Sequence, residues 1–475
     1  MVFSSNLFIL YFLPIFLIIY YLSPSTWRNY IILFFSIIFY AWGAPKFVFL
    51  LIGSSVANFY VVKELSKQSN LSKKKWYLAL SIFLNLSILI YFKYANFFLE
   101  NVNVFLSMFN FNNLTWTKIV LPIGISFFTF QSITYSVDVF RKIRSPLNRV
   151  TDYIMYIMLF PQMIAGPIVR FNTIAEEIND RKKNETLDNI LYGFILFSIG
   201  LGKKVLLANP MGKYADIAFS SDIANMSTVN AWLGVIAYGF QIYYDFSGYS
   251  DMAIGIGRMI GFTFPENFNA PYISKSITEF WRRWHITLGE WMKDYLYIPL
   301  GGNRVNSKSR VFFNLWFVFL VSGFWHGASW NFVLWGIYHG SFLIFDRIFL
   351  IKLTRKFNKH VNIILTYILV LIGWVIFRCE SVEEIHTYFK QMFIYKAAPG
   401  NLSISQEYIV IALLSSVFAF LPATKLGLRL MNLVYAKKQN LNSLLFLSIV
   451  SLIILALSIG AISTSKFNPF IYFRF

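Results

Sequence analysis

The chain has 475 residues, of which 57% are hydrophobic and 13% are charged, and its mean hydropathy is +0.57. Because a soluble domain carries about 25% charged residues, this composition excludes an ordinary soluble protein and predicts an all-α polytopic membrane protein. The net charge of +20 does not indicate nucleic acid, since the Lys and Arg residues cluster in short loops, as in cytoplasmic loops that face anionic lipid.

Apolar runs close to the ~20 residues that a transmembrane helix needs recur along the whole chain. The first run has no preceding positive charge and no small-residue cleavage site, so we expect a retained span and not a signal peptide. The basic loops, which we place in the cytoplasm, are 63–75, 141–149, 282–310, 352–359 and 425–438. About twelve spans follow, near 7–22, 28–44, 47–62, 77–98, 117–139, 186–207, 229–246, 311–325, 330–350, 361–378, 408–422 and 442–464.

One apolar stretch, 151–169, does not read as a crossing. It contains Pro161, Gly166 and Pro167, and basic segments flank it on both sides. Irregular backbone at membrane depth is tolerated only where protein buries it or a cavity wets it, so we expect a re-entrant or broken helix. No stretch is polar and long enough for a separate soluble domain, and we therefore expect one integral membrane domain over residues 1–475.

Two carboxylates, Asp245 and Asp251, lie in a hydroxyl-rich run at the end of a predicted span. Carboxylates so close to an apolar run need partners, which Arg258 or the arginines at 282 and 283 could supply. Asp245 is a candidate for a structural role at a site, and a simple helix-end cluster of hydrogen bonds is an equally open alternative.

The segment 262–310 is the longest polar-aromatic stretch between spans. Ser276 and Glu279 have the spacing of a capping box, which predicts a helix start, and Glu279 and Arg283 form a favourable i,i+4 pair. Such a helix is too polar to cross lipid alone, so we expect it at the cytoplasmic interface or along a cavity. The segment ends in a glycine turn, Tyr297–Arg304, whose backbone amides are expected to be free for a ligand.

Three of the five histidines are candidates for a site or a packed position, whereas His360 and His386 lie in polar loops and are expected to be solvated. His326 sits in the tryptophan-rich stretch Ser322–Trp330 between two apolar runs, and ionisable groups at membrane depth usually mark a pathway or a site. His285 is expected to share one face of its helix with Trp281, Leu288 and Met292. His339 lies thirteen residues after His326, would face away from it on a continuous helix, and is expected to pack or form a hydrogen bond.

The sequence carries no serine-hydrolase elbow, Walker A loop, His-Glu-x-x-His or Cys-x-x-Cys motif, and its single cysteine, Cys379, excludes a multi-cysteine metal site. We expect no metal and no bound cofactor. Two histidines without a visible nucleophile suit acyl transfer in which the acceptor supplies its own hydroxyl. His326, expected to be buried among Phe324, Trp325 and Trp330, is the predicted catalytic base, and Trp325 is a candidate for binding the substrate or donor.

Four basic residues surround His285 in the sequence: Arg282, Arg283, Lys293 and Arg304. An acyl-CoA such as acetyl-CoA carries several phosphates, and an acyl carrier protein is usually acidic, so clustered Lys and Arg would attract either donor. His285 would then orient the thioester carbonyl or the pantetheine arm. The alternative is that these charges only anchor the helix to anionic lipid.

Five separated motifs give the chain a resemblance to a known family. They are Leu121–Gln131, Phe160–Arg170, Asp245–Gly255, Phe280–Asn303 and Phe324–Ala328. Together they resemble the membrane-bound O-acyltransferase (MBOAT) superfamily, and within it the bacterial alginate O-acetyltransferase-like branch. The motif-bearing core covers about residues 115–350.

The resemblance implies helices around a central funnel, with the invariant family histidine at His326 and a second family histidine at His285. It implies a multi-pass protein of the bacterial cytoplasmic membrane that carries an acyl group, expected to be acetyl, from a cytoplasmic thioester towards polysaccharide hydroxyls. Transfer would be direct or relayed by an extracytoplasmic acetyltransferase or esterase-like partner. D-alanyl transfer to teichoic acid, a non-enzymatic transporter and a structural membrane subunit are the alternatives.

Overall fold

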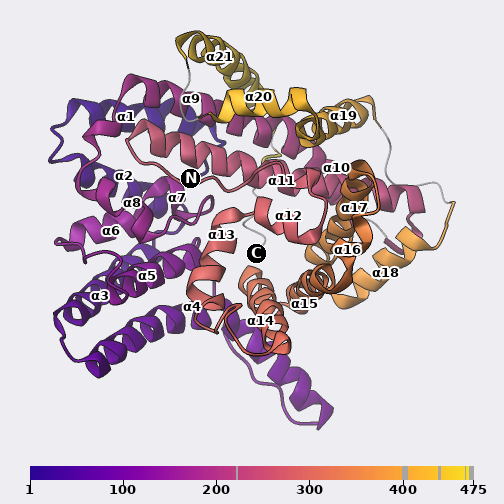
Figure 1. Ribbon diagram of the computed structural model, residues 1–475, viewed down its shortest axis with the longest axis horizontal. Helices are drawn as coiled ribbons and strands as arrows, with labels where there is room; N and C mark the ends of the chain where they lie inside the picture. The colour runs from indigo at the N-terminus through magenta and orange to yellow at the C-terminus, as the bar shows by residue number, and fades with distance from the viewer. Residues whose placement is uncertain (221–222, 398–404, 437–439, 466, 470–475) are drawn as a thin grey trace. The chain divides into compact units, whose positions relative to one another are not determined.

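The computed structural model describes residues 1–220, 223–397, 405–436, 440–465 and 467–469, and every regular element in these ranges is a helix (Figure 1). The predicted all-α polytopic fold is confirmed. Contacts divide the described chain into two compact units. The first unit holds residues 1–2, 7–186 and 260–264, and the second holds 3–6, 187–259 and the chain from 265 onward. The expectation of a single domain stays a prediction.

The first unit contains the N-terminal helices. They are η1 (Phe8–Phe12), α1 (Leu13–Leu22), α2 (Arg28–Gly43), α3 (Phe47–Lys67), α4 (Leu71–Met108), α5 (Ile125–Phe140), α6 (Val150–Met158), α7 (Phe160–Met163), α8 (Phe171–Asn179) and η2 (Lys182–Asn184).

The second unit contains the remaining helices. They are α9 (Leu187–Gly202), η3 (Lys203–Ala208), α10 (Asn209–Ser220), η4 (Ile223–Asn225), α11 (Thr228–Met259), η5 (Pro271–Ile273), α12 (Ile277–Arg283), α13 (Ile286–Met292), η6 (Lys293–Tyr297), α14 (Lys308–His326), α15 (Trp330–Phe345), η7 (Asp346–Leu350), α16 (Ile351–Thr354), α17 (Lys359–Arg378), α18 (Val382–Phe393), α19 (Gln406–Phe420), η8 (Leu421–Ala423), α20 (Lys425–Tyr435) and α21 (Leu441–Thr464).

Seven helical stretches in the described residues are long and apolar enough to cross a membrane, and the shorter apolar stretches Phe8–Leu22 and Arg28–Gly43 match the first two predicted spans. The other three predicted spans overlap α5, α11 and α14, which do not combine the length and the hydropathy of the seven candidate spans. Within the predicted basic loop 425–438, residues 425–435 form the short helix α20 between the candidate spans Gln406–Ala423 and Leu441–Thr464, and Lys437 and Lys438 lie outside the described residues.

Helix α5 begins eight residues later than the sequence predicts. The preceding segment contains Pro122, and the N-cap residue Gly124 has φ +75°, a left-handed conformation that favours glycine. A Cβ on Gly124 would lie 2.6 Å from the carbonyl oxygen of Met163. The chain therefore enters α5 through a turn whose shape depends on glycine. After Met163, the irregular backbone from residue 164 to residue 169 is buried, which confirms the predicted broken helix.

Helix α11 is longer than predicted, because it continues past the apolar run through the hydroxyl-rich segment to Met259. It packs closely against α9 along a glycine seam. A Cβ on Gly193 would lie 2.5 Å from the carbonyl oxygen of Gly255, and a Cβ on Gly200 equally close to that of Gly248. Small residues at such positions let two helix backbones approach closely, and this brings the carboxylates of α11 within reach of lysines that follow α9.

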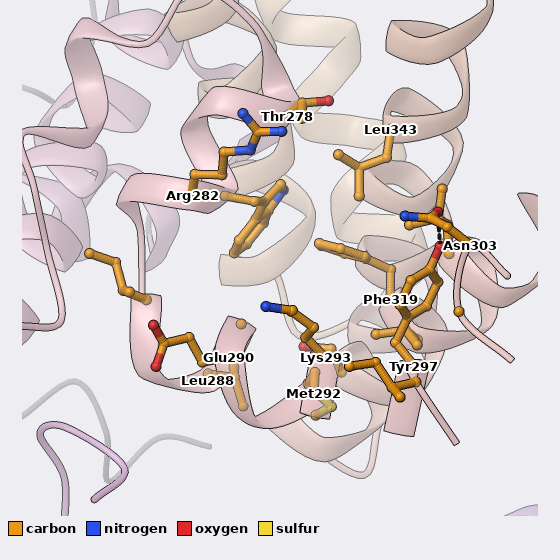
Figure 2. A pocket seen from close by; sticks show the side chains of 18 of the residues that line it. Thr278, Arg282, Leu288, Glu290, Met292, Lys293, Tyr297, Asn303, Phe319 and Leu343 are labelled. Atoms are coloured by element: carbon orange, nitrogen blue, oxygen red, sulfur yellow. Dashed lines mark hydrogen bonds between the residues drawn. The ribbon is translucent and has the colours of Figure 1, made fainter. Parts of the chain in front are cut away.

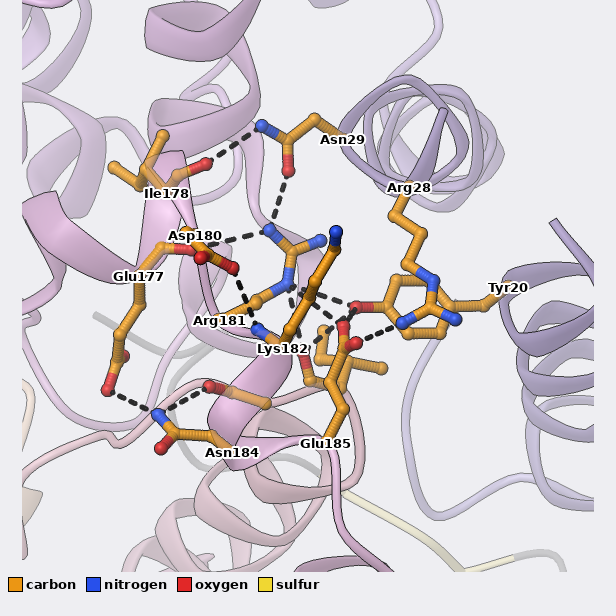
Figure 3. Close-up of polar contacts among 12 residues, drawn as sticks. Tyr20, Arg28, Asn29, Glu177, Ile178, Asp180, Arg181, Lys182, Asn184 and Glu185 are labelled. Atoms are coloured by element: carbon orange, nitrogen blue, oxygen red, sulfur yellow. Dashed lines mark hydrogen bonds and ion pairs between the residues drawn. The ribbon is translucent and has the colours of Figure 1, made fainter. Parts of the chain in front are cut away.

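A buried ionic cluster in the first unit connects the end of α1 and the start of α2 with the segment that follows α8 (Figure 3). Arg181 donates from Nη1 to Asn29 Oδ1 at 2.7 Å and from Nε to the Tyr20 hydroxyl at 3.0 Å. Glu185 forms an ion pair with Arg28 and accepts a hydrogen bond from the same tyrosine. Removing one partner of a buried pair leaves an uncompensated charge, so this cluster ties α1 and α2 to the loop that follows α8.

The segment that follows α4 turns back along the C-terminal part of that helix. The helix and this segment form a hairpin over residues 96–119. Asn103 donates from Nδ2 to the carbonyl oxygen of Leu114 at 2.9 Å and accepts from its N–H at 2.8 Å. Asn96 makes the same pair of bonds with Ile119, at 2.8 and 3.0 Å. The two side-chain amides therefore act on the extended segment as a neighbouring strand would.

Candidate active site

A cavity of about 750 Å³ opens in the second unit around the segment that the sequence singled out. Its walls come from α12, α13, η6, the glycine turn after η6, α14 and the end of α15. Arg282 on α12 and Lys293 at the start of η6 lie on different walls (Figure 2). His285 also lines this space.

His285 does not lie within a continuous helix, which corrects the expectation that it shares a helical face with Trp281. Helix α12 ends at Arg283, and His285 has φ +45° before α13 begins. A left-handed backbone at a non-glycine residue is costly and is concentrated at functional sites. The break still leaves Trp281, Leu288 and Met292 on the cavity wall together with His285.

The tautomer of His285 follows from its hydrogen bonds. Its Nδ1 lies 3.0 Å from Asn267 Oδ1. That oxygen also accepts from the backbone N–H and the hydroxyl of Thr287, at 3.3 and 2.9 Å, while Asn267 Nδ2 donates to Ser250 Oγ at 3.1 Å. The amide orientation is thus fixed by a backbone donor, so Nδ1 of His285 carries the hydrogen and Nε2 is left with a lone pair.

His285 Nε2 is buried and has no hydrogen-bond partner among the described residues, and only 2% of the residue is exposed. The residue lies outside the seven long candidate spans. Burial lowers the pKa of His285 to about 3, because desolvation disfavours the charged imidazolium. The imidazole is therefore neutral near pH 7 and can accept a proton or a hydrogen bond at Nε2.

His326 ends helix α14 and is surrounded by aromatic rings. The ring of Trp325 lies 4.7 Å away, that of Trp335 5.1 Å and that of Phe377 5.2 Å, measured between centroids. The prediction that His326 is buried is wrong, because His326 is half-buried. Trp330, which was expected to cover it, is 55% exposed and begins α15 after the turn that follows Gly327.

Trp325 lies between the two candidate histidines. Its ring centroid is 6.3 Å from that of His285 and 4.7 Å from that of His326, and only 4% of the residue is exposed. The structure thus brings His285 and His326, which are separated by the whole of α13 and α14, close to one indole. Of these three residues, His285 belongs to the cavity lining.

Three of the four predicted donor-binding cations, Arg282, Lys293 and Arg304, line the cavity. Arg283 does not, because it pairs with Glu279 at 3.0 Å and donates to the carbonyl oxygen of Asn269 at 3.1 Å. The predicted capping box is confirmed by a hydrogen bond of 3.1 Å from the Glu279 N–H to Ser276 Oγ. The helix cap and its i,i+4 pair therefore hold Arg283 away from the site.

The glycine turn lines the cavity, but its backbone amides are not free as expected. Gly301 N–H donates to the carbonyl oxygen of Ile298 and Gly302 N–H to that of Tyr297, both at 2.9 Å. The two glycines have φ of +103° and +55°. Because the turn closes on its own carbonyls, it contributes to the cavity through its side chains, among them Tyr297, Asn303 and Arg304.

Asp245 lies away from the cavity and is paired with a lysine that the sequence analysis missed. Lys204 Nζ lies 2.9 Å from Asp245 Oδ1, with side-chain exposures of 3% and 2%, and Lys203 Nζ lies 2.7 Å from Asp251 Oδ2. The expected arginine partners are therefore wrong. The glycine seam explains the difference, since it places the end of α9 against α11.

Replacing Asp245 by leucine is expected to lower the free energy of unfolding by about 3–5 kcal/mol, because Lys204 would become a buried unpaired charge. Thermal unfolding in detergent, followed by tryptophan fluorescence, measures this loss. Adding Lys204→Met should recover most of it. Asp245→Asn keeps an acceptor for the lysine and should retain appreciable acyl transfer; equal loss in the Asn and Leu variants would instead indicate a required negative charge.

Two residues of the site were missed. Asn267 sets the tautomer of His285 from 18 residues away, and nothing in its neighbourhood of the sequence marks it. Arg347 also lines the cavity and donates to Asn303 Oδ1 at 3.4 Å. Arg347 lies at the end of an apolar run, on the side assigned to the cytoplasm, and this position could have marked it as a further donor-binding cation.

Known proteins are similar to this chain in sequence. The sequence profile of MBOAT, the membrane-bound O-acyltransferase family, matches residues 149–383. The chain is 38% identical over 506 aligned residues to the protein named "Probable alginate O-acetylase AlgI" of Azotobacter vinelandii, and the alignment covers 100% of both chains. The chain belongs to the MBOAT family.

Two further relatives of this MBOAT protein are named for other activities. It is 39% identical to the peptidoglycan O-acetyltransferase of Helicobacter pylori over 420 residues, which cover 81% of this chain and 78% of the relative. It is 28% identical to the teichoic acid D-alanyltransferase of Bacillus subtilis over 289 residues, which cover 56% and 70%. Membership of the family confirms that this MBOAT protein is a multi-pass membrane O-acyltransferase.

Proposed function

We propose that this protein moves an acyl group, expected to be acetyl, from a cytoplasmic thioester across the membrane to hydroxyl groups of an extracytoplasmic polysaccharide. Support for the acceptor class comes from the relatives named alginate O-acetylase and peptidoglycan O-acetyltransferase, both of which align with most of this chain. The D-alanyl alternative has weaker support, since that relative matches 56% of the chain at 28% identity.

The observation that carries the proposal is the lone pair of His285 Nε2, buried at the wall of a cavity lined with cations. While neutral, this nitrogen accepts hydrogen bonds and cannot donate one to a thioester carbonyl. We therefore propose that His285 does not orient the thioester carbonyl. Its Nε2 accepts a hydrogen bond from a donor group of the substrate instead. The amide N–H groups of a pantetheine arm and the acceptor hydroxyl are both such groups.

In the proposed reaction, His326 acts as the general base, as the sequence predicts. The acceptor hydroxyl gives up its proton as its oxygen attacks the thioester carbonyl, a C–O bond forms and the C–S bond breaks. The proton held by the imidazole then passes to the departing thiolate, so the step is neutral overall. Trp325, packed between the two histidines, would keep their spacing fixed.

The cations of the cavity would receive the donor. Arg282, Lys293, Arg304 and Arg347 line one space, and clustered cations attract the phosphates of coenzyme A or an acidic carrier protein. Both donors present the acyl group on a phosphopantetheine thioester. We place the protein in the bacterial cytoplasmic membrane, with these residues on the cytoplasmic side and an extracytoplasmic acetyltransferase or esterase-like partner as the relay towards the polymer.

The proposed function is tested by transfer of radiolabelled acetyl from acetyl-CoA into polysaccharide in membrane vesicles, with wild-type protein compared to His326→Ala. Labelled polymer is expected only with the wild type. Transfer from D-alanyl carrier protein, with none from acetyl-CoA, would favour the D-alanyl alternative. Transport of intact thioester without acylation would overturn the proposal.

Charge reversal at Arg282 and Arg304 is expected to raise the apparent KM for the donor about tenfold or more, because a hydrogen bond to a charged group contributes about 1.5–3 kcal/mol. The apparent KM should rise further at high salt, because salt screens the attraction of the remaining cations for the donor. The measurement is initial rate against donor concentration at two ionic strengths. Arg310→Glu is a matched control, since Arg310 is exposed and absent from the cavity lining.

Unchanged donor dependence in the Arg282 and Arg304 variants, together with less protein in the membrane, would contradict the donor site. It would support the alternative that these residues anchor the segment to anionic lipid.

A further inference from the structure

An aromatic cluster joins the cavity wall to the surroundings of His326. Trp281 of α12 lines the cavity, and its ring lies 5.3 Å from that of Trp335 and 4.9 Å from that of His339, both on α15. Trp335 in turn lies 5.1 Å from His326 and 4.9 Å from His339. His339 thus belongs to the same cluster as His326, contrary to the expectation that it faces away.

The reason is the turn at 327–329, which folds α14 and α15 into a hairpin instead of a continuous helix. The expected hydrogen bond of His339 is confirmed. Trp281 Nε1 lies 3.4 Å from His339 Nδ1, and an indole nitrogen is only a donor. Nδ1 of His339 therefore accepts, and the ring hydrogen resides on Nε2.

The far side of the His339 ring has no room to move. A Cβ built on Gly373 of α17 would lie 2.6 Å from His339 Nε2, and only 1% of the histidine is exposed. The ring is therefore confined between a glycine of α17 and the indole edge of Trp281. Its single acceptor atom is aimed at the one polar atom of a residue that forms part of the cavity wall.

We propose that His339 is a positioning residue that fixes Trp281, and through Trp281 the part of the cavity wall that this indole forms. The consequence for catalysis rests on the proposed function. His339 touches no reacting group, so its effect passes through the orientation of the Trp281 indole. An apolar side chain of similar size at 339 would fill the same space but would leave the half-buried indole N–H of Trp281 without its acceptor, which is unfavourable.

Fluorine NMR tests the positioning without any substrate. The protein is labelled with 5-fluorotryptophan in detergent, and the Trp281 resonance is assigned by its loss in Trp281→Phe. His339→Leu is expected to shift or broaden that resonance. His339→Asn, whose Oδ1 can replace the Nδ1 acceptor, should restore a single line near the wild-type position. An unchanged Trp281 resonance in His339→Leu would overturn the proposal.

A second variant covers the case in which His339→Leu fails to fold. Gly373→Ala leaves both partners of the hydrogen bond intact but pushes on His339 from behind, and alanine is the better helix former. It should disturb the Trp281 resonance as His339→Leu does. Tyr338→Phe is the matched control, because it removes a hydrogen bond of 2.8 Å between α15 and α17, from Tyr338 to the Leu369 carbonyl, without touching the Trp281 bond.

A double-mutant cycle links the positioning to acyl transfer. His339→Leu and Trp281→Phe are each expected to lower kcat/KM for the donor about 3- to 10-fold, the size of one net hydrogen bond. The double variant should lose no more than the larger single effect, since both changes break the same bond. Additive losses would overturn the proposal. Absence of transfer in wild-type protein would instead count against the proposed function, while the NMR result still stands.

Discussion

Replacing His326 by alanine is expected to reduce acyl transfer at least ~10²-fold, the contribution of general-base catalysis, in a protein that still inserts and folds. His326 is half-buried at the end of α14, against the rings of Trp325, Trp335 and Phe377. Removing a half-buried imidazole costs the fold little compared with the loss of the base. Radiolabelled transfer and thermal unfolding, measured on one preparation, separate the two effects.

The chain supplies its own controls for this substitution. His360 and His386 are exposed, so alanine at either position should leave transfer within about twofold of wild type, as is usual for surface substitutions. Full activity of His326→Ala would end its assignment as the base. A loss matched by equal loss of folded protein would reduce His326 to a structural residue.

The second large effect is expected at His285. His285→Ala should also lose at least ~10²-fold in transfer, because it removes the buried acceptor Nε2 from the cavity wall. With its pKa lowered to about 3, His285 stays neutral in the wild type from about pH 5 to 8. The rate should therefore show no acid limb from this group in that range.

Asn267→Asp tests the tautomer directly. A carboxylate beside Nδ1 stabilises the imidazolium and raises the pKa of His285 towards its ordinary value. Protonation then removes the Nε2 lone pair as the pH falls, so an acid limb should appear in the pH–rate profile below about pH 6–7. Asn269→Asp adds the same charge at an exposed neighbour and should leave the wild-type profile unchanged. Identical profiles for Asn267→Asp and wild type would contradict the assigned role.

What the sequence could predict was local. The Ser276 cap, the Glu279–Arg283 pair and the broken helix after 150 each depend on residues within a turn or two of one another, and each is confirmed. The apolar runs gave most helix positions for the same reason. The end of α11 was predicted too early, because the polar residues of its C-terminal part are typical of a helix end. The sequence does not show that buried partners on other helices pair with them.

What the sequence could not predict depends on distant contacts. Asp251 and Lys203 are 48 residues apart, and only the glycine seam between α9 and α11 brings such residues together. Arg282 and Arg283 are equivalent by composition, and the phase of one short helix decides that Arg282 alone lines the cavity. The tautomer of His285 depends on an asparagine that no local pattern connects to it.

The hairpin formed by the end of α4 and the segment after it is a suitable place to insert another domain. Two asparagines hold its extended segment by imitating peptide groups, so its order owes little to the residues at its tip, where Met108 and Phe111 are 72% and 65% exposed. Exposed tips of this kind accept insertions readily. A small rigid domain grafted between 109 and 113 would therefore add recognisable mass to a membrane protein that is otherwise difficult to align in electron micrographs.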